Sequence, residues 1–94
     1  MGSTDSAVRR RLVVHGRVQG VFFRASCRDE ASASGVAGSA DNLDDGAVEV
    51  VLEGEQGAVE AVVAWARTGP AHAEVTDVDV YEEQPQGLSG FTVS

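Results

Sequence analysis

The sequence predicts an α+β sandwich with the element order β-α-β-β-α-β, in which an antiparallel sheet carries two helices on one face. Three observations support this fold class. The chain has 94 residues, which is the size of one domain. Four stretches alternate apolar and polar residues with the two-residue period of a strand. Two stretches of helical character each lie between two of these strands.

The first half of the chain predicts a strand, a loop, a helix and a second strand. Residues 8–15 alternate and end in β-branched residues, which favours a strand. The segment bracketed by Gly16 and Gly20 predicts a tight loop. Residues 22–34 predict a helix that stops before a glycine, and residues 36–42 predict the second strand. The stripe of this helix that faces the sheet, a weakly apolar one, is predicted to comprise Phe22, Ala25, Ser26, Asp29 and Ala33.

A hairpin and a second helix follow. Residues 43–46 end in Asp-Gly, a dipeptide that strongly favours a hairpin turn. Residues 47–53 alternate between a polar and an apolar face, which predicts a third strand that Gly54 ends. Residues 55–67 give the clearest helix of the chain. Its apolar residues recur with helical spacing at Val59, Val62, Val63 and Ala66.

Residues 75–83 alternate again and predict the fourth strand. Residues 84–90 predict a loop, and residues 91–94 a short last strand or a tail. With right-handed crossovers this order gives the split βαββαβ arrangement called ferredoxin-like. We expect one domain over residues 8–94, preceded by a flexible N-terminal lead-in over residues 1–7.

The charge of the chain argues against nucleic acid as a partner. Fifteen acidic residues face seven basic ones, which gives a net charge of −8, and all seven bases are arginines. A duplex-binding surface needs a basic face that releases counterions from phosphate. An acidic chain without lysine fits either adaptation to high salt or a codon bias towards arginine, and the sequence leaves both explanations open.

The remaining composition indicates a cytoplasmic protein. No run of 18 apolar residues occurs, so no membrane-spanning helix is expected. No apolar segment follows the basic residues near the N-terminus, so no secretory signal is expected. The single cysteine, Cys27, has no partner for an internal disulfide or a thiolate metal site. We expect a monomer that needs no metal and no other cofactor.

The segment between the first strand and the first helix carries the strongest chemical signal. A glycine-containing loop before a helix lets successive backbone N–H groups converge on one anion. Arg24 lies in the first turn of that helix, where its guanidinium can bind phosphate or carboxylate oxygens in a bidentate manner. An ordinary strand–helix turn with a surface arginine explains the same residues, and the spacing leaves this alternative open.

Two motifs resemble those of the acylphosphatase family. The first is Gly16-x-Val18-Gln19-Gly20-Val21-x-Phe23-Arg24. The second is Gly38-x-x-x-Asn42-x-x-x-Gly46-x-Val48, followed by a glycine. The order of elements is also similar to that family from about residue 8 to residue 93.

This resemblance implies a fold, a reaction and a set of site residues. The implied fold is ferredoxin-like, and the implied reaction is hydrolysis of the mixed anhydride between a carboxylic acid and phosphate, without a metal or a covalent enzyme intermediate. By motif position, Arg24 binds the phosphoryl oxygens and Asn42 orients the attacking water. The implied phosphoryl cradle is the backbone of Gly16, Arg17, Val18, Gln19, Gly20 and Val21.

The second motif departs from the family pattern at two positions. Ser39 stands where an aromatic residue is usual, and Asp41 stands where a basic residue is usual. Neighbouring residues of a strand point to opposite faces, so Asp41 is expected to face away from Asn42. These departures keep a second hypothesis open, in which the domain binds phosphate without hydrolysing it. As a binding module, the chain also resembles the acylphosphatase-like domain that opens the hydrogenase-maturation carbamoyltransferases.

Other candidate residues carry weaker signals. His15 is positioned as a possible general base but fits a strand-end histidine better, and His72 has no ligand at metal-binding spacing. Cys27 fits a half-buried apolar residue better than a nucleophile. Trp65 is expected either to pack on the sheet or to be partly exposed. An RNA-recognition domain of the same topology is disfavoured, because no strand carries the aromatic residues that stack bases.

Overall fold

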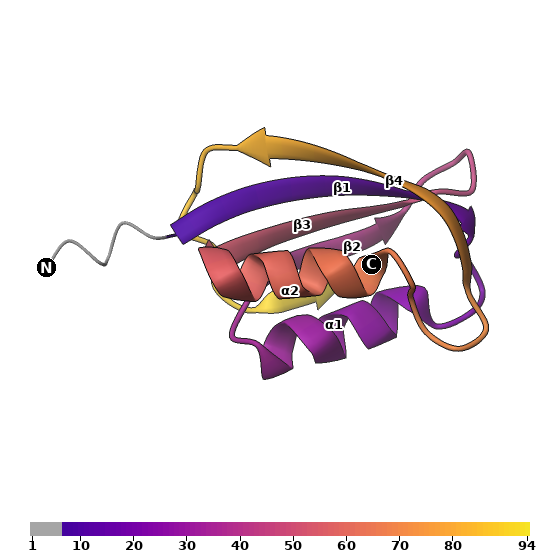
Figure 1. Cartoon of the computed structure of the whole chain (residues 1–94), viewed down its shortest axis with the longest axis horizontal. Coiled ribbons are helices and arrows are strands. Elements are labelled where there is room, and N and C mark those ends of the chain that lie inside the picture. The colour runs from indigo at the N-terminus through magenta and orange to yellow at the C-terminus, as the bar shows by residue number, and fades with distance from the viewer. Residues whose placement is uncertain (1–6) are drawn as a thin grey trace, which may run out of the picture.

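A computed structural model describes residues 7–94, which form a sheet covered by two helices on one face (Figure 1). The elements alternate along the chain as the sequence predicts, with a short strand added at the end. They are β1 (Ala7–Arg17), α1 (Phe23–Ala33), β2 (Ala37–Asn42), β3 (Val48–Glu55), α2 (Gln56–Ala66), β4 (Glu74–Glu83) and β5 (Phe91–Val93). Residues 1–6 of the predicted lead-in lie outside the described residues.

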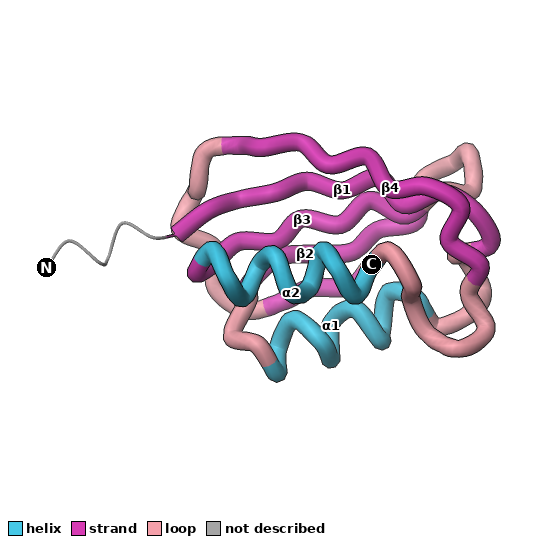
Figure 2. Tube along the Cα trace, viewed as in Figure 1, coloured by secondary structure: helices cyan, strands magenta, loops and turns pink. Residues whose placement is uncertain are grey.

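The strand order in the sheet is β4-β1-β3-β2-β5. β1 pairs antiparallel with both β3 and β4, and β2 pairs antiparallel with β3. The four predicted strands therefore form the expected antiparallel sheet. β5 differs, because it pairs in parallel with β2 and makes the sheet mixed. Figure 2 shows the strands side by side, with the two helices in front of the sheet. The long loop after β4 passes the end of β3, where three of its backbone N–H groups donate to Glu53, and β5 then runs in the same direction as β2.

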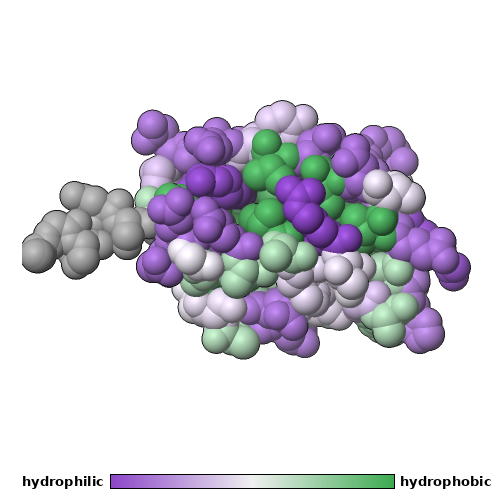
Figure 3. All heavy atoms as spheres, viewed as in Figure 1, coloured by the Kyte–Doolittle hydropathy of each residue, from purple (hydrophilic) through white to green (hydrophobic). Residues whose placement is uncertain are grey.

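The core lies between the sheet and the two helices. β1 contributes Leu12 and Val14, and β3 contributes Val48, Val50 and Leu52, all of which are fully buried. These residues alternate with exposed or half-buried ones, as expected for a sheet with one covered face. Figure 3 shows apolar side chains in the middle of the helix-bearing face, surrounded by hydrophilic ones.

The two helices differ in how well the sequence predicts their buried faces. In α2 the buried residues are Val59, Val62 and Ala66, as the helical spacing predicts. In α1 the predicted stripe is wrong, because the structure buries Phe23, Cys27 and Ala31 instead. The helix begins one residue later than predicted, and the large ring of Phe23 fixes its rotation by packing on Trp65 with a centroid distance of 5.3 Å.

Two strand boundaries also differ from the prediction. Gly54 does not end the third strand but lies inside β3, where it pairs with Val8. Gly16 and Arg17 belong to β1 rather than to the loop, and both pair with β4. Glycine is poor evidence for a strand end when the neighbouring backbone continues the ladder of hydrogen bonds.

Candidate active site

The sheet topology brings the ends of two strands to one place. β1 and β2 both run antiparallel to β3, so their C-terminal ends lie at the same end of the sheet. Val14, Val48 and Asn42 form one row across the three strands. The loop that follows β1 and the residue that ends β2 are therefore neighbours in the fold, although about 20 residues separate them in the sequence (Figure 1).

Gly16 shapes the entry to this loop. The register between β1 and β4 shifts between His15 and Gly16, and Gly16 has a φ of 119°. A Cβ at this position would collide with the carbonyl oxygen of Glu74 and lie 2.8 Å from the backbone nitrogen of Thr76. Only glycine allows β4 to approach this closely, and the resulting bulge turns the chain out of the sheet.

The loop itself is fixed by two buried residues and turned by two left-handed ones. Val18 and Val21 are buried in the core. Gly20 has a φ of 76°, and Phe22 has a φ of 65°. Left-handed residues within a short turn bring backbone N–H groups to the same side, which makes a concave surface suited to an anion.

α1 begins directly at the end of this loop. Its N-cap is Phe22, and no side chain accepts a hydrogen bond from the first turn. The first N–H groups of the helix are thus left for another acceptor, at the end where the helix dipole is positive. This arrangement favours a bound anion at the start of α1.

A pocket of about 240 Å³ opens at this point. Arg24 lines it together with Gly20, the glycine of the loop turn, so a basic residue and the left-handed turn border the same space. Within residues 7–94, the ion pairs of the protein do not include Arg24, which leaves its charge available. The lining residues are Val18, Gly20, Phe22, Phe23, Arg24, Ala25 and Val93.

Gln19 joins the loop to the hairpin between β2 and β3. Its side-chain Nε2 donates to the carbonyl oxygens of Leu43 and Ala47, both at 2.8 Å. Asp45 supports the same turn by accepting a hydrogen bond from the N–H of Ala47 at 3.0 Å. The side-chain N–H donors of Gln19 are therefore committed to the hairpin, and its backbone N–H is the donor that remains for an anion.

Asn42 is exposed at the end of β2 and lies outside the lining of the pocket. It shares its row with Val48, whose side chain faces the helices, whereas Asp41 pairs with Glu49 in the next row. The two neighbouring residues thus belong to opposite faces, as predicted. Asp41 contacts the hydroxyl of Ser94 after β5. Arg17 is exposed and pairs with Glu74, away from the pocket lining.

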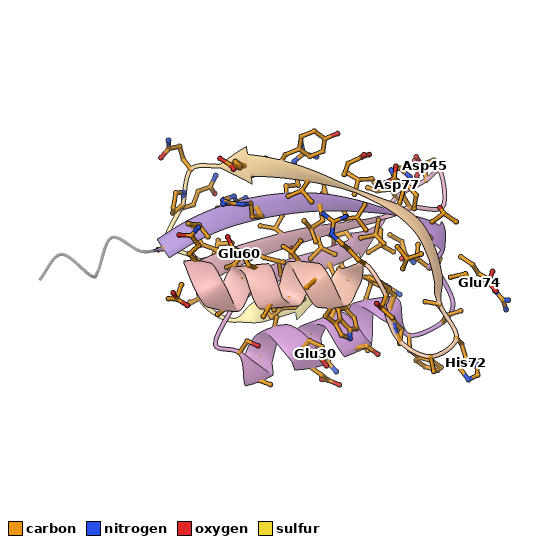
Figure 4. All side chains as sticks on the ribbon, viewed as in Figure 1. Glu30, Asp45, Glu60, His72, Glu74 and Asp77 are labelled. Atoms are coloured by element: carbon orange, nitrogen blue, oxygen red, sulfur yellow. The ribbon has the colours of Figure 1, made fainter. Side chains whose placement is uncertain are left out.

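The weaker candidates lie elsewhere. His15 pairs with Asp79 at 3.0 Å on the open face of the sheet. Burial raises the pKa of the Cys27 thiol to about 12, which suits a core residue and not a nucleophile. His72 lies on the loop between α2 and β4, at the outer edge of the domain (Figure 4).

Among the described residues, no three side chains of the metal-binding types come together. No helix in residues 7–94 is long and apolar enough to cross a membrane.

Sequence reasoning missed two residues of this site. Phe22 was expected on the buried stripe of the helix but is the exposed N-cap residue that lines the pocket. Val93 reaches the pocket from β5, whose parallel pairing with β2 places it beside Ala40. The exposure of Phe22 could have been predicted from its neighbour Phe23, because only one of two adjacent helix residues can face the core. No local signal identified Val93.

Comparison with known proteins agrees with the two sequence motifs. The family model for acylphosphatase matches residues 10–93. A curated acylphosphatase of Haloquadratum walsbyi is 46% identical over 90 residues, which span 96% of this chain and 97% of that protein. A second, from Rubrobacter xylanophilus, is 51% identical and covers 99% of this chain and 86% of its own length. Among solved structures, an acylphosphatase from Coxiella burnetii superposes with a TM-score of 0.93 at 33% identity, covering 100% of this chain and 99% of that one.

Proposed function

Because the chain belongs to the acylphosphatase family, we propose that it is an enzyme that hydrolyses the carboxyl–phosphate bond of acyl phosphates. The products are a carboxylate and inorganic phosphate. The observation that carries this proposal is the pocket at the start of α1, which Arg24 and the left-handed Gly20 both line. The motif resemblance implies this reaction, and a pocket lined by an arginine at a helix N-terminus supports binding of the phosphoryl group.

Binding of the phosphoryl group is the first step of the proposed mechanism. The backbone N–H groups of the loop from Val18 to Val21 and of the first turn of α1 donate to the phosphoryl oxygens, because Gly16 and Arg17 pair with β4 instead. Arg24 neutralises the charge that remains. The −8 chain repels anions at long range, so a local concentration of donors is needed to hold one. The free helix N-terminus and the guanidinium supply it.

We assign to Asn42 the role of orienting the attacking water. A side-chain amide offers both an acceptor and a donor, so it can orient a water without removing its proton. Asn42 lies at the end of the sheet where the loop begins, and Gln19 ties that loop to the hairpin that follows Asn42. This link supports a water position between the amide and the phosphoryl group.

The chemistry makes modest demands on the protein. The water oxygen forms a bond to phosphorus while the bond from phosphorus to the acyl oxygen breaks. The carboxylate leaves with the electron pair, and the proton of the water passes to a phosphate oxygen. A carboxylate is a good leaving group, so positioning and charge stabilisation carry the rate. This fits a site whose side chains are an arginine and an amide.

The experiment is benzoyl phosphate hydrolysis by the purified protein in the presence of chelator. Arg24→Ala is expected to abolish turnover and to weaken the binding of inorganic phosphate. Asn42→Ala is expected to abolish turnover while phosphate still binds. Arg28→Ala is the matched control, because Arg28 is an exposed arginine on the same helix that pairs with Asp29. Near-wild-type rates in both site variants would show that the assignment is wrong.

One departure in the second motif favours a second candidate function. Asp41 places a negative charge beside Asn42, and Asn42 itself lies outside the pocket lining. A domain that binds phosphate without hydrolysing it would show phosphate binding that depends on Arg24, with no turnover at any salt concentration. The same assay therefore separates the two functions.

We further propose that the protein acts as a cytoplasmic monomer on a small-molecule substrate, without nucleic acid, membrane or cofactor.

A further inference from the structure

Phe22 combines two unfavourable features. Its side chain is 78% exposed, which makes it the most exposed large apolar residue of the described chain. Its backbone is left-handed, with a φ of 65° and a ψ of 23°, and it is the single residue other than glycine with a positive φ among residues 7–94. Bulky side chains rarely adopt this conformation. Neither core packing nor backbone preference explains a phenylalanine here.

The neighbours of Phe22 hold it outside. Val21 before it and Phe23 after it are both buried, and the ring of Phe23 packs on Trp65. With both neighbours anchored in the core, the chain cannot rotate to bury the ring of Phe22. The structure thus presents this ring to solvent in a defined place, and backbone strain of this kind is often found at functional positions.

That place is the mouth of the phosphoryl pocket. Phe22 lines the pocket together with Arg24. Val18, Ala25 and Val93 also line it. The lining therefore combines one charged side chain, suited to a phosphoryl group, with apolar side chains that include an exposed aromatic ring. An acyl phosphate has the same division, because its phosphoryl group is joined to an organic acyl group.

We propose that Phe22 is the residue that recognises the acyl group and that it favours aromatic and large apolar acyl phosphates over short ones. This inference rests on the proposed function. The ring of Phe22 covers one side of the acyl group once the phosphoryl group is held by Arg24 and the loop. Aromatic groups gain by stacking on a second ring or packing at its edge, and both partners lose apolar surface to water. A two-carbon acyl group is too small to gain this contact.

The test compares two substrates in one set of variants. The ratio of kcat/KM for benzoyl phosphate to kcat/KM for acetyl phosphate is measured in the wild type, Phe22→Ala and Phe22→Tyr. We expect the ratio to fall about tenfold in Phe22→Ala, mainly through a higher KM for benzoyl phosphate, which is the size of effect that one aromatic contact gives. Phe22→Tyr keeps the ring and is expected to keep the ratio.

Two controls separate recognition from a general change of structure. Leu88→Ala removes another exposed apolar side chain, which is 41% exposed and lines a different pocket, and the ratio should not change. The inhibition constant of inorganic phosphate, which has no acyl group, should change less than twofold in Phe22→Ala. A folded Phe22→Ala variant with an unchanged substrate ratio would overturn the inference, as would a parallel loss of phosphate binding.

The outcomes also distinguish this inference from the proposed function. If the wild type hydrolyses both substrates and the ratio does not respond to Phe22, acyl recognition by this ring is wrong and the proposed hydrolysis stands. If the wild type hydrolyses neither substrate, the proposed function fails and acyl recognition fails with it.

Discussion

The side-chain amide nitrogen of Gln19 lies 2.8 Å from the carbonyl oxygen of Ala47. The same nitrogen donates to the carbonyl oxygen of Leu43 at an equal distance. These two hydrogen bonds connect the loop that leads to Arg24 with the hairpin that follows Asn42. The proposed mechanism needs Arg24 and Asn42 at one phosphoryl group. Gln19 therefore fixes the position of the loop before Arg24 relative to the hairpin after Asn42.

We predict that Gln19→Glu lowers both stability and turnover. A carboxylate accepts hydrogen bonds and cannot donate them, so it would face two carbonyl oxygens without a proton between them. The loss of two partly buried hydrogen bonds is expected to cost about 1–3 kcal/mol of unfolding free energy. Urea denaturation measures this cost, and benzoyl phosphate hydrolysis measures the accompanying fall in kcat.

Gln84→Glu provides the control for charge. It makes the same substitution in the exposed loop after β4, so it adds one negative charge without touching the hairpin. We expect it to leave kcat and the urea midpoint nearly unchanged. If Gln84→Glu lowered kcat as much as Gln19→Glu, the added charge and not the lost link would be responsible.

Glu53 is predicted to make the fold sensitive to acid. Its carboxylate is only 5% exposed and accepts backbone hydrogen bonds from Gln86, Gly87 and Leu88, the shortest at 2.6 Å. Arg9 donates to its other oxygen at 3.2 Å. Burial acts to raise the pKa of Glu53, but these donors together bring it below its ordinary value of 4.5. The carboxylate therefore holds the loop between β4 and β5.

The sign of the pH effect follows from this direction. A carboxylate whose pKa is lower in the folded state stabilises the fold above its ordinary pKa, and that stability is lost as the pH falls through the folded value. Glu53→Gln should reduce the unfolding free energy by about 1–3 kcal/mol at pH 7. The difference from wild type should shrink below pH 4.5. Urea titrations from pH 7 to pH 3 test this.

Glu82→Gln is the matched control for this titration. The side chain of Glu82 is 81% exposed and lies 3.8 Å from Arg10, so its ion pair contributes little. Glu83 behaves differently, because hydrogen bonds from Arg9 and Arg11 lower its pKa, and it adds to the acid sensitivity of the wild type. A Glu53→Gln variant as stable as Glu82→Gln at pH 7 would contradict the role given to the buried carboxylate.

The sequence predicts the strands and the position of the loop before α1 well because their signals are local. Alternation marks β1 and β4, and the glycines mark the turn before Arg24. The errors come from tertiary contacts. Val93 joins the pocket through a parallel pairing with β2, which no local pattern encodes. Which face of α1 is buried depends on which of two adjacent phenylalanines packs on Trp65. Gln19 can form its hydrogen bonds only when the hairpin lies beside the loop.

Two glycines in the paired strands β2 and β3 are predicted to respond differently to alanine. Gly38 has a φ of 154°, and a Cβ there would collide with the carbonyl oxygen of Val51 on the neighbouring strand. Gly38→Ala must push β2 away from β3 and should greatly lower the thermal midpoint. Gly54→Ala is the control, because its Cβ would meet ordinary contacts of 3.6 Å. Equal thermal midpoints in the two variants would contradict the close approach at Gly38.

The strain at Phe22 predicts that removing it stabilises the protein. Glycine adopts the left-handed conformation freely, whereas other residues lose about 1–2 kcal/mol there. Phe22→Ala keeps the strain and removes the ring, and Phe22→Gly removes both. The difference between these two variants in urea denaturation therefore isolates the backbone contribution, and we expect Phe22→Gly to be more stable by about 1 kcal/mol. If Phe22→Ala were as stable as Phe22→Gly, the left-handed backbone would carry no strain. In that case only the exposure of the Phe22 ring, and not its backbone conformation, would call for a functional explanation.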